Sequence, residues 1–219
     1  MPRPRAVIFD MDGLMIDSER LYRDAQSDIA RSFGKPPPSH DTLRKMMGQK
    51  PMDSIGILIN DLELPAAPEE ILARRDRLME EKLRSDLKPM PGLPEIIKNL
   101  GGHLPLAVAT GSNRRFLNLV MERLDLGKSF RVLKCEDDVH KGKPDPEIYL
   151  RTAQALDTAP EDCVVLEDSE NGARAAHAAG CMTIAIPSEY TREQDFSMAH
   201  ACLDNLFEAS ARIDSMLED

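Results

Sequence analysis

Two aspartates separated by one residue, Asp10 and Asp12, follow a short apolar segment near the start of the chain. Carboxylates this close repel each other, and a shared proton or a bound divalent cation relieves the repulsion. Because Mg²⁺ prefers hard oxygen ligands, the pair is a candidate magnesium site. Asp-Met-Asp-Gly is also ordinary turn chemistry, so the pair alone leaves both interpretations open.

A second polar segment, Thr110-Gly111-Ser112, follows another apolar run. Such a turn directs backbone N–H groups and a hydroxyl to one place, and a following helix adds the positive end of its dipole. The segment therefore predicts a phosphate-binding turn, with helix N-capping by Ser112 or Asn113 as the alternative. The chain contains no Gly-x-x-x-x-Gly-Lys-Ser/Thr run, which argues against a nucleoside-triphosphate loop.

A lysine and a second acidic pair complete the set of residues that could take part in catalysis or binding. Lys143 precedes a proline, which favours extended backbone and lets the ammonium group point inward, although a surface lysine is the plain alternative. Glu167 and Asp168 end a further apolar run and lead through a glycine-containing turn into an alanine-rich helix. A second acidic pair at the end of an apolar run favours function over chance.

The elements that must position these residues are predicted from hydrophobic patterning. Buried strands are expected at residues 5–9, 104–109, 130–133, 163–166 and 182–186. Helical periodicity separates them, which indicates a parallel sheet, and their continuous apolar character indicates helices on both faces. Because the carboxyl ends of parallel strands meet at one edge, the acids, the hydroxyl turn and the lysine are expected there together.

One long segment breaks this alternation and offers helical patterns without a convincing strand. Helices are expected at residues 18–33, 51–61 and 68–86, separated by proline-rich breakers. We therefore predict a doubly wound α/β core with a parallel sheet, formed by residues 1–16 and 90–219, and an inserted helical domain at 17–89.

Composition narrows the classes of protein. The formal net charge of −10 and the small aromatic content, with no Trp, argue against nucleic-acid binding. No apolar stretch is long enough for a membrane span or a signal sequence, so we expect a cytoplasmic protein without a membrane partner. The four cysteines lack C-x-x-C spacing and are expected to be reduced and mostly buried, and the five histidines lack helical ligand spacing, which argues against zinc.

The motifs Asp10-Met-Asp-Gly, Thr110-Gly-Ser, Lys143-Pro-Asp-Pro and Glu167-Asp168 resemble, in order, the four motifs of the haloacid dehalogenase superfamily. The resemblance covers the whole α/β part. The segments at residues 9–19 and 167–180 resemble its β-phosphoglucomutase-like branch, whose members carry a helical cap after the first motif. The resemblance implies a Rossmann-like core with a cap. It also implies phosphate chemistry, because the dehalogenases of the superfamily lack an acid at the position of Asp12.

The resemblance further implies a role for each motif residue. Asp10 would be the nucleophile that forms an aspartyl-phosphate, and Asp12 would protonate the leaving oxygen and later activate water. Mg²⁺ would be held by Asp10, the backbone carbonyl of Asp12 and Asp168, with Glu167 as a ligand or close neighbour. The groups implied to hold the phosphoryl oxygens are Thr110, the amides of Gly111 and Ser112, and Lys143.

Within this branch the sequence favours a phosphatase over a mutase. The mutases carry a cap histidine where this chain has Tyr22, and a cap arginine for the distal phosphate where it has Pro51. The first cap helix with Tyr22 and the segment 47–50 are more similar to phosphatases of small sugar phosphates or pseudouridine 5′-phosphate. Other cap cations are expected mainly on solvated helix faces, although each could contact a substrate; they are Lys50, Arg74, Arg75 and Arg77.

The predicted function is Mg²⁺-dependent hydrolysis of a small phosphomonoester, a sugar phosphate or a compound like a nucleoside monophosphate, by a monomer or weak dimer. A β-phosphoglucomutase-type phosphomutase is the alternative. A response-regulator receiver, another class, is disfavoured because its phosphoacceptor follows a later strand in a much shorter chain without an insertion. A silent binding protein is disfavoured by the intact set of Asp10, Asp12, Lys143 and Asp168.

Overall fold

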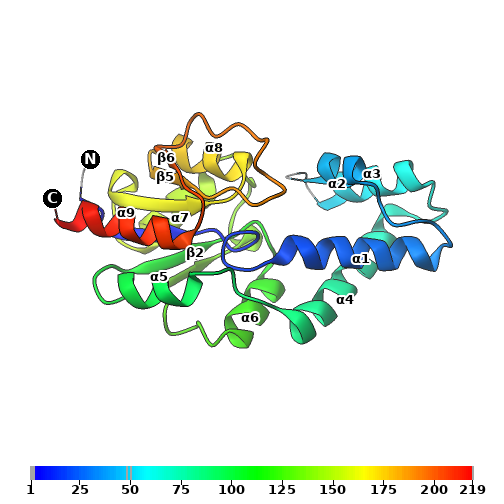
Figure 1. The fold of residues 1–219 in the computed structure, drawn as a ribbon, viewed down its shortest axis with the longest axis horizontal. Helices are drawn as coiled ribbons and strands as arrows, with labels where there is room; N and C mark the ends of the chain where they lie inside the picture. The colour runs from blue at the N-terminus through cyan, green and yellow to red at the C-terminus, as the bar shows by residue number, and fades with distance from the viewer. Residues whose placement is uncertain (1–2, 48, 50, 219) are drawn as a thin grey trace. The chain divides into compact units, whose positions relative to one another are not determined.

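The computed structural model describes residues 3–47, 49 and 51–218. Its α/β core contains a six-stranded sheet (Figure 1). The strands run in the order β3-β2-β1-β4-β5-β6, and every pairing is parallel, which confirms the predicted α/β class. Their bounds are β1 (Ala6–Phe9), β2 (Leu106–Ala109), β3 (Val132–Lys134), β4 (Cys163–Glu167), β5 (Met182–Ala185) and β6 (Ala201–Cys202). The two-residue β6 was not predicted, because it is too short and too exposed to give an apolar run.

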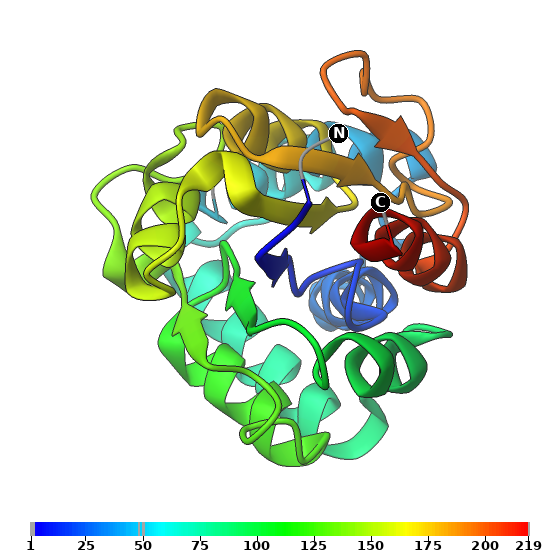
Figure 2. The same cartoon turned by 90° about the vertical axis from the view of Figure 1, so that its left-hand side faces the viewer.

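Every residue of β1, β2, β4 and β5 is buried, as their continuous apolar sequences predict for strands covered on both faces. Ala6 and Ile8 of β1 pack in one cluster with Tyr149 and Ala175 from two core helices. Figure 2 shows helices on the two sides of the sheet, with α5 and α9 packed together on one side. The helices are α5 (Leu93–Leu100), α6 (Arg114–Arg123), α7 (Glu147–Ala155), α8 (Glu170–Ala178) and α9 (Leu206–Glu218), with short 3-10 turns η1 (Glu136–Asp138) and η2 (Pro160–Asp162).

Residues 18–87 form a separate helical unit, and residues 1–17 with 88–219 form the α/β unit. The helices are α1 (Ser18–Ser32), α2 (His40–Met46), α3 (Pro51–Leu62) and α4 (Pro68–Asp86). An apolar cluster that includes Ile29, Ile55 and Ile71 gives this unit its own core. The helical insertion is therefore confirmed. Helix α2 was not predicted; it begins after three prolines and is capped by Ser39, whose Oγ accepts from the Thr42 N–H at 3.1 Å.

The arginines of α4 occupy different environments. Arg75 is buried, lies over the ring of Tyr22 and donates to Asp76, so the expectation of a solvated helix face is wrong for this residue. Arg77 is exposed and Arg74 is half-buried. The buried residues of α4 share one helix face; they are Ile71, Arg75, Met79 and Leu83. Arg75 can lie on this face because the methylene groups of its side chain pack as apolar surface. Lys50 lies outside the described residues.

Cys135, Cys163 and Cys181 are buried, Cys202 is exposed, and all four are free thiols, which agrees with reduced and mostly buried cysteines. Among the helices that the structure describes, none is both long and apolar enough to cross a lipid bilayer.

Candidate active site

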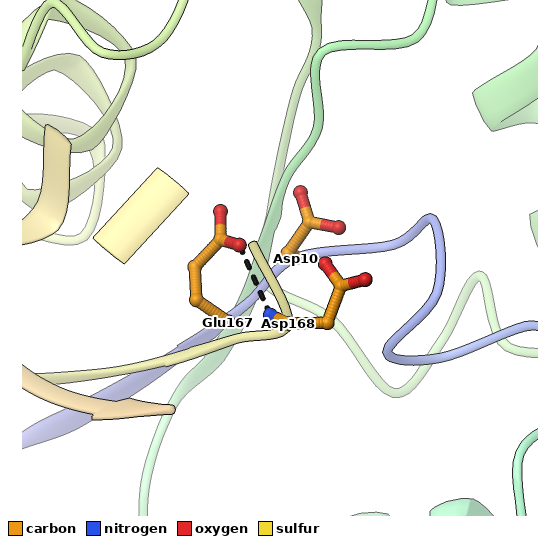
Figure 3. Close-up of side chains that lie close together, drawn as sticks. All are labelled: Asp10, Glu167 and Asp168. Atoms are coloured by element: carbon orange, nitrogen blue, oxygen red, sulfur yellow. Dashed lines mark hydrogen bonds between the residues drawn. The ribbon is translucent and has the colours of Figure 1, made fainter. Parts of the chain in front are cut away.

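Three carboxylates from two neighbouring strands meet at the carboxyl edge of the sheet. Asp10 follows β1, while Glu167 ends β4 and Asp168 comes next; β1 and β4 are paired, with Phe9 opposite Leu166. Each residue offers an oxygen, and these oxygens all lie within 4.8 Å of one another (Figure 3). The three side chains are buried, and burying three negative charges together is costly unless cations compensate them.

Lys143 supplies one compensating charge. Its Nζ donates to Asp10 Oδ1 at 2.5 Å, to Glu167 Oε1 at 2.6 Å and to the Ala109 carbonyl oxygen at 3.1 Å. Burial by itself lowers the pKa of Lys143, but the adjacent Asp10 and Glu167 raise it well above its ordinary value, so the ammonium stays charged. The surface-lysine alternative is therefore wrong.

One ammonium against three carboxylates leaves an excess of negative charge in a buried place. Burial raises the pKa of Asp10 to about 8, Lys143 opposes this effect, and the charges of Glu167 and Asp12 add to it. A divalent cation would restore the balance and favour the ionised carboxylate, because bound cations reverse such pKa shifts. The donor set therefore fits Mg²⁺: it consists of hard carboxylate oxygens within mutual reach.

Two glycines allow the carboxylates to come this close. A Cβ at Gly13 would lie 2.1 Å from Asp168 Oδ2, and one at Gly172 would lie 1.8 Å from Glu167 Oε1. Gly13 also has φ +78°, in the left-handed region that disfavours side chains. The glycine of Asp-Met-Asp-Gly thus serves both the turn and the site. Sequence reasoning treated Gly172 only as part of a turn.

The Glu167 carboxylate accepts five hydrogen bonds. Oε1 accepts from Lys143 Nζ and from the Tyr149 hydroxyl, each at 2.6 Å. Oε2 accepts from the Asp168 N–H, the Ser169 N–H and the Ser169 hydroxyl, at 3.1, 3.2 and 3.1 Å. Sequence reasoning missed Tyr149, because a tyrosine on the apolar face of a helix is indistinguishable by pattern from a core residue.

Asp12 lies in the second part of the site, with the hydroxyl turn after β2. Its Oδ2 accepts from the Ser112 hydroxyl at 2.7 Å and from the Thr110 hydroxyl at 3.1 Å. Thr110 Oγ1 in turn accepts from the Ser112 N–H at 3.0 Å, which tightens the turn that contains Gly111. Asn113 caps α6 by accepting from the Phe116 N–H at 3.0 Å, so Asn113 is the N-cap and Ser112 faces the acid instead.

The structure therefore brings the sequence-predicted residues to one edge of the sheet, where they form two hydrogen-bonded groups. Asp10 and Asp12, which flank Met11 in the chain, belong to different groups. The first contains Asp10, Lys143, Glu167 and Asp168, and the second contains Asp12, Thr110 and Ser112. A carboxylate beside a fixed ammonium, with further acids and hydroxyls nearby, can bind a cation and an oxyanion and can transfer protons.

The parallel α/β sheet carries acids, a lysine and hydroxyls at its carboxyl edge, as the four sequence motifs predict. The chain matches the family model "Haloacid dehalogenase-like hydrolase" over residues 7–186, and it belongs to this family. The matched range includes every residue of the site, and the match confirms the family that the four motifs indicate.

Two curated relatives are named as phosphatases. The chain is 41% identical over 179 residues to "Phosphorylated carbohydrates phosphatase" of Thermotoga maritima, a match that covers 80% of this chain and 81% of the relative. It is 32% identical over 206 residues to "Probable pseudouridine-5'-phosphatase" of Drosophila melanogaster, with 91% and 88% covered.

A solved structure supports the same fold. The crystal structure of CbbY from Rhodobacter sphaeroides in complex with phosphate has a TM-score of 0.84 to this chain at 26% identity, and the match covers 98% of this chain and 100% of that one. The matched range therefore includes the helical insertion after the first motif.

Proposed function

We propose that this protein is a Mg²⁺-dependent phosphatase that hydrolyses a small phosphomonoester through an aspartyl-phosphate on Asp10. The observation that carries the proposal is the contact of Lys143 with both Asp10 and Glu167 inside a buried acidic cluster. Burying such a cluster costs folding free energy unless a cation offsets its charge, so its presence indicates a functional role and not a contribution to stability.

In the proposed reaction a carboxylate oxygen of Asp10 attacks the phosphorus atom, and the bond from phosphorus to the ester oxygen breaks. Asp12 acts as the general acid and gives a proton to that leaving oxygen, so an alcohol departs. Asp12 then takes a proton from a water molecule, whose oxygen attacks phosphorus. The Asp10–phosphorus bond breaks, and inorganic phosphate leaves with Asp10 restored.

The remaining residues neutralise and orient the phosphoryl group, which is most of what phosphoryl transfer asks of a protein. Lys143 would exchange one of its present acceptors for a phosphoryl oxygen. Thr110 and Ser112, with the Gly111 amide, would donate to the other oxygens. Mg²⁺ would be held by Asp10, Asp168 and the backbone carbonyl of Asp12, with Glu167 as a ligand or close neighbour, and it would offset phosphoryl charge.

For the substrate, we propose a phosphorylated sugar or a related polyol phosphate. The Thermotoga relative, named for phosphorylated carbohydrates, is the more similar of the two phosphatases. The Drosophila relative, named as a probable pseudouridine-5'-phosphatase, makes nucleoside monophosphate-like compounds the second group to test. Tyr22 and Pro51 stand where the resembling mutases carry a histidine and an arginine, which supports a phosphatase over a mutase.

The test is a screen of phosphomonoesters with purified protein and MgCl₂, in which released inorganic phosphate is measured with and without a chelator. We expect turnover of one or more sugar phosphates that a chelator abolishes and added Mg²⁺ restores. Absence of phosphate release from every compound, with Mg²⁺ present and the protein folded, would contradict the proposal.

A second assay separates phosphatase from mutase. The protein is incubated with β-glucose 1-phosphate and a sugar bisphosphate primer, and both products are followed. We expect free phosphate to form faster than glucose 6-phosphate; the opposite order would establish the mutase.

A further inference from the structure

Tyr149 of α7 contacts two charged groups of the site at once. The side chain is completely buried. Its hydroxyl donates to Glu167 Oε1 at 2.6 Å, and the centroid of its ring lies 5.0 Å from Lys143 Nζ. A buried tyrosine hydroxyl needs a hydrogen-bond acceptor, and a backbone carbonyl would meet that need. Here the acceptor is the carboxylate oxygen that also binds Lys143, which ties Tyr149 to the site.

The hydroxyl of Tyr149 is one of two donors to Glu167 Oε1. Lys143 and Tyr149 donate to this same oxygen, while Oε2 is engaged by three donors from Asp168 and Ser169. A tyrosine hydroxyl has one O–H donor, and that of Tyr149 goes to Oε1 at 2.6 Å. The carboxylate is therefore held at both oxygens.

The position of the Lys143 ammonium depends on this arrangement. An ammonium has three N–H donors, and those of Lys143 go to Asp10, Glu167 and the Ala109 carbonyl. Asp10 is the proposed nucleophile, and its contact is the one that Lys143 would exchange for a phosphoryl oxygen. Glu167 and the Ala109 carbonyl then remain as anchors, together with the face of the Tyr149 ring, which attracts cations.

We propose that Tyr149 is a positioning residue, which places the Lys143 ammonium through Glu167 Oε1 and through its own ring. It follows that Glu167 serves as the partner of Lys143 and not as a direct ligand of the metal, because both its oxygens are already engaged. The inference rests on the proposed function in one respect: Lys143 is taken to offset the charge of the phosphoryl group.

The first test is Tyr149→Phe, which keeps the ring and removes the hydroxyl. We expect kcat to fall about tenfold while KM stays within about twofold, since a misplaced ammonium weakens charge compensation in the transition state. The dissociation constant of Mg²⁺, measured by calorimetry without substrate, should change by less than about twofold, because the hydroxyl acts on a residue that does not ligate the metal.

The matched control is Thr152→Val on the same helix. Thr152 is also completely buried, and its hydroxyl donates to the Ile148 carbonyl at 2.7 Å. This variant removes one buried hydroxyl from α7 without touching Lys143 or Glu167. We expect kcat, KM and Mg²⁺ affinity within about twofold of the unmodified protein.

A readout that does not need activity is the side-chain ammonium signal of Lys143 in ¹H–¹⁵N NMR spectra. Three hydrogen bonds in a buried place should protect it from exchange, and the signal is identified by its loss in Lys143→Met. We expect it to shift or broaden in Tyr149→Phe and to stay unchanged in Thr152→Val.

An unchanged kcat and an unchanged ammonium signal in Tyr149→Phe would overturn the inference. Weaker Mg²⁺ binding as the main effect, with kcat restored at saturating Mg²⁺, would overturn it as well, because Tyr149 would then act through a metal ligand. If the unmodified protein releases no phosphate from any ester, the proposed function fails, and the NMR comparison still decides whether Tyr149 places Lys143.

Discussion

The two groups of side chains in the site are held in different ways. In the first, which we call the charged half, an ammonium contacts two buried carboxylates; it comprises Asp10, Lys143, Glu167 and Asp168. In the second, the hydroxyl half, hydroxyls contact one acid, and both Asp12 and Ser112 are partly exposed; it comprises Asp12, Thr110 and Ser112.

This difference corresponds to two demands of phosphoryl transfer. Charge compensation requires groups that do not move, and the charged half provides them through short contacts and through the glycines that let the acids approach. Proton transfer requires groups that can donate or accept, and a hydroxyl can do both by rotation. The charged half should therefore respond severely to any change, and the hydroxyl half more mildly.

The largest effect is expected from Asp10→Asn, which removes the proposed nucleophile from the charged half. We expect kcat to fall by at least about 10⁴-fold, because neutral amides do not form the acyl-phosphate. The metal-free protein should be no less stable than the unmodified one, since a buried negative charge is removed. Initial rates and denaturant unfolding would measure both.

Asp125→Asn is the control for this change. Asp125 is exposed and has φ 52°, a conformation that asparagine adopts readily, so its rate and stability should be unaffected. Residual activity of Asp10→Asn within about a hundredfold of normal would show that the charged half does not contain the nucleophile.

The second effect in size is expected from Gly172→Ala. The added Cβ would meet Glu167 Oε1 at 1.8 Å and push the carboxylate, and with it Lys143, out of place. We expect a loss of about a hundredfold in kcat and about 2–3 kcal/mol in the free energy of unfolding.

Gly56→Ala provides the comparison. Gly56 lies in α3, where nothing stands within 4 Å of an added Cβ, so alanine should stabilise that helix by up to about 1 kcal/mol without changing kcat. If the two substitutions changed kcat equally, the charged half would tolerate displacement of Glu167 and Lys143.

A milder effect is expected from Ser112→Ala in the hydroxyl half. Asp12 would lose its shorter hydrogen bond, at 2.7 Å, and keep the one from Thr110. We expect kcat to fall about tenfold, as for a proton donor that is less well oriented, and the free energy of unfolding to change by less than about 1 kcal/mol. A loss as large as that of Gly172→Ala would erase the distinction between the two halves.

The strands and the residues at their ends could be predicted from the sequence, because a buried parallel strand is a continuous apolar run and the polar residue after it marks the sheet edge. Asp10 and Glu167 were located in this way. Hydrophobic patterning also separated the inserted helices from the core. The roles assigned to Asp10 and Asp12 came from the family resemblance, since spacing alone left an ordinary turn as an alternative.

The interactions of Tyr149, Gly172 and Arg75 could not be predicted. Periodicity indicates which face of a helix is buried, and it does not indicate which polar atom a side chain on that face reaches. Tyr149 and Glu167 are 18 positions apart, and their contact depends on how α7 lies against the sheet. Gly172 lies in the first turn of α8, where a glycine in an alanine-rich helix indicates close packing and does not indicate which residue is the neighbour.

The smallest effect is expected from Asn113→Ala, which tests whether the hydroxyl half depends on the helix that follows it. The Asn113 side chain caps α6 through the Phe116 N–H at 3.0 Å. Its loss should cost about 1 kcal/mol in the free energy of unfolding, the usual cost of an N-cap. The hydroxyl turn has its own internal hydrogen bond between Thr110 and Ser112, so kcat should stay within about twofold of normal. A fall beyond about fivefold in fully folded protein would show that the cap positions the turn. The hydroxyl half would then be held as rigidly as the charged half.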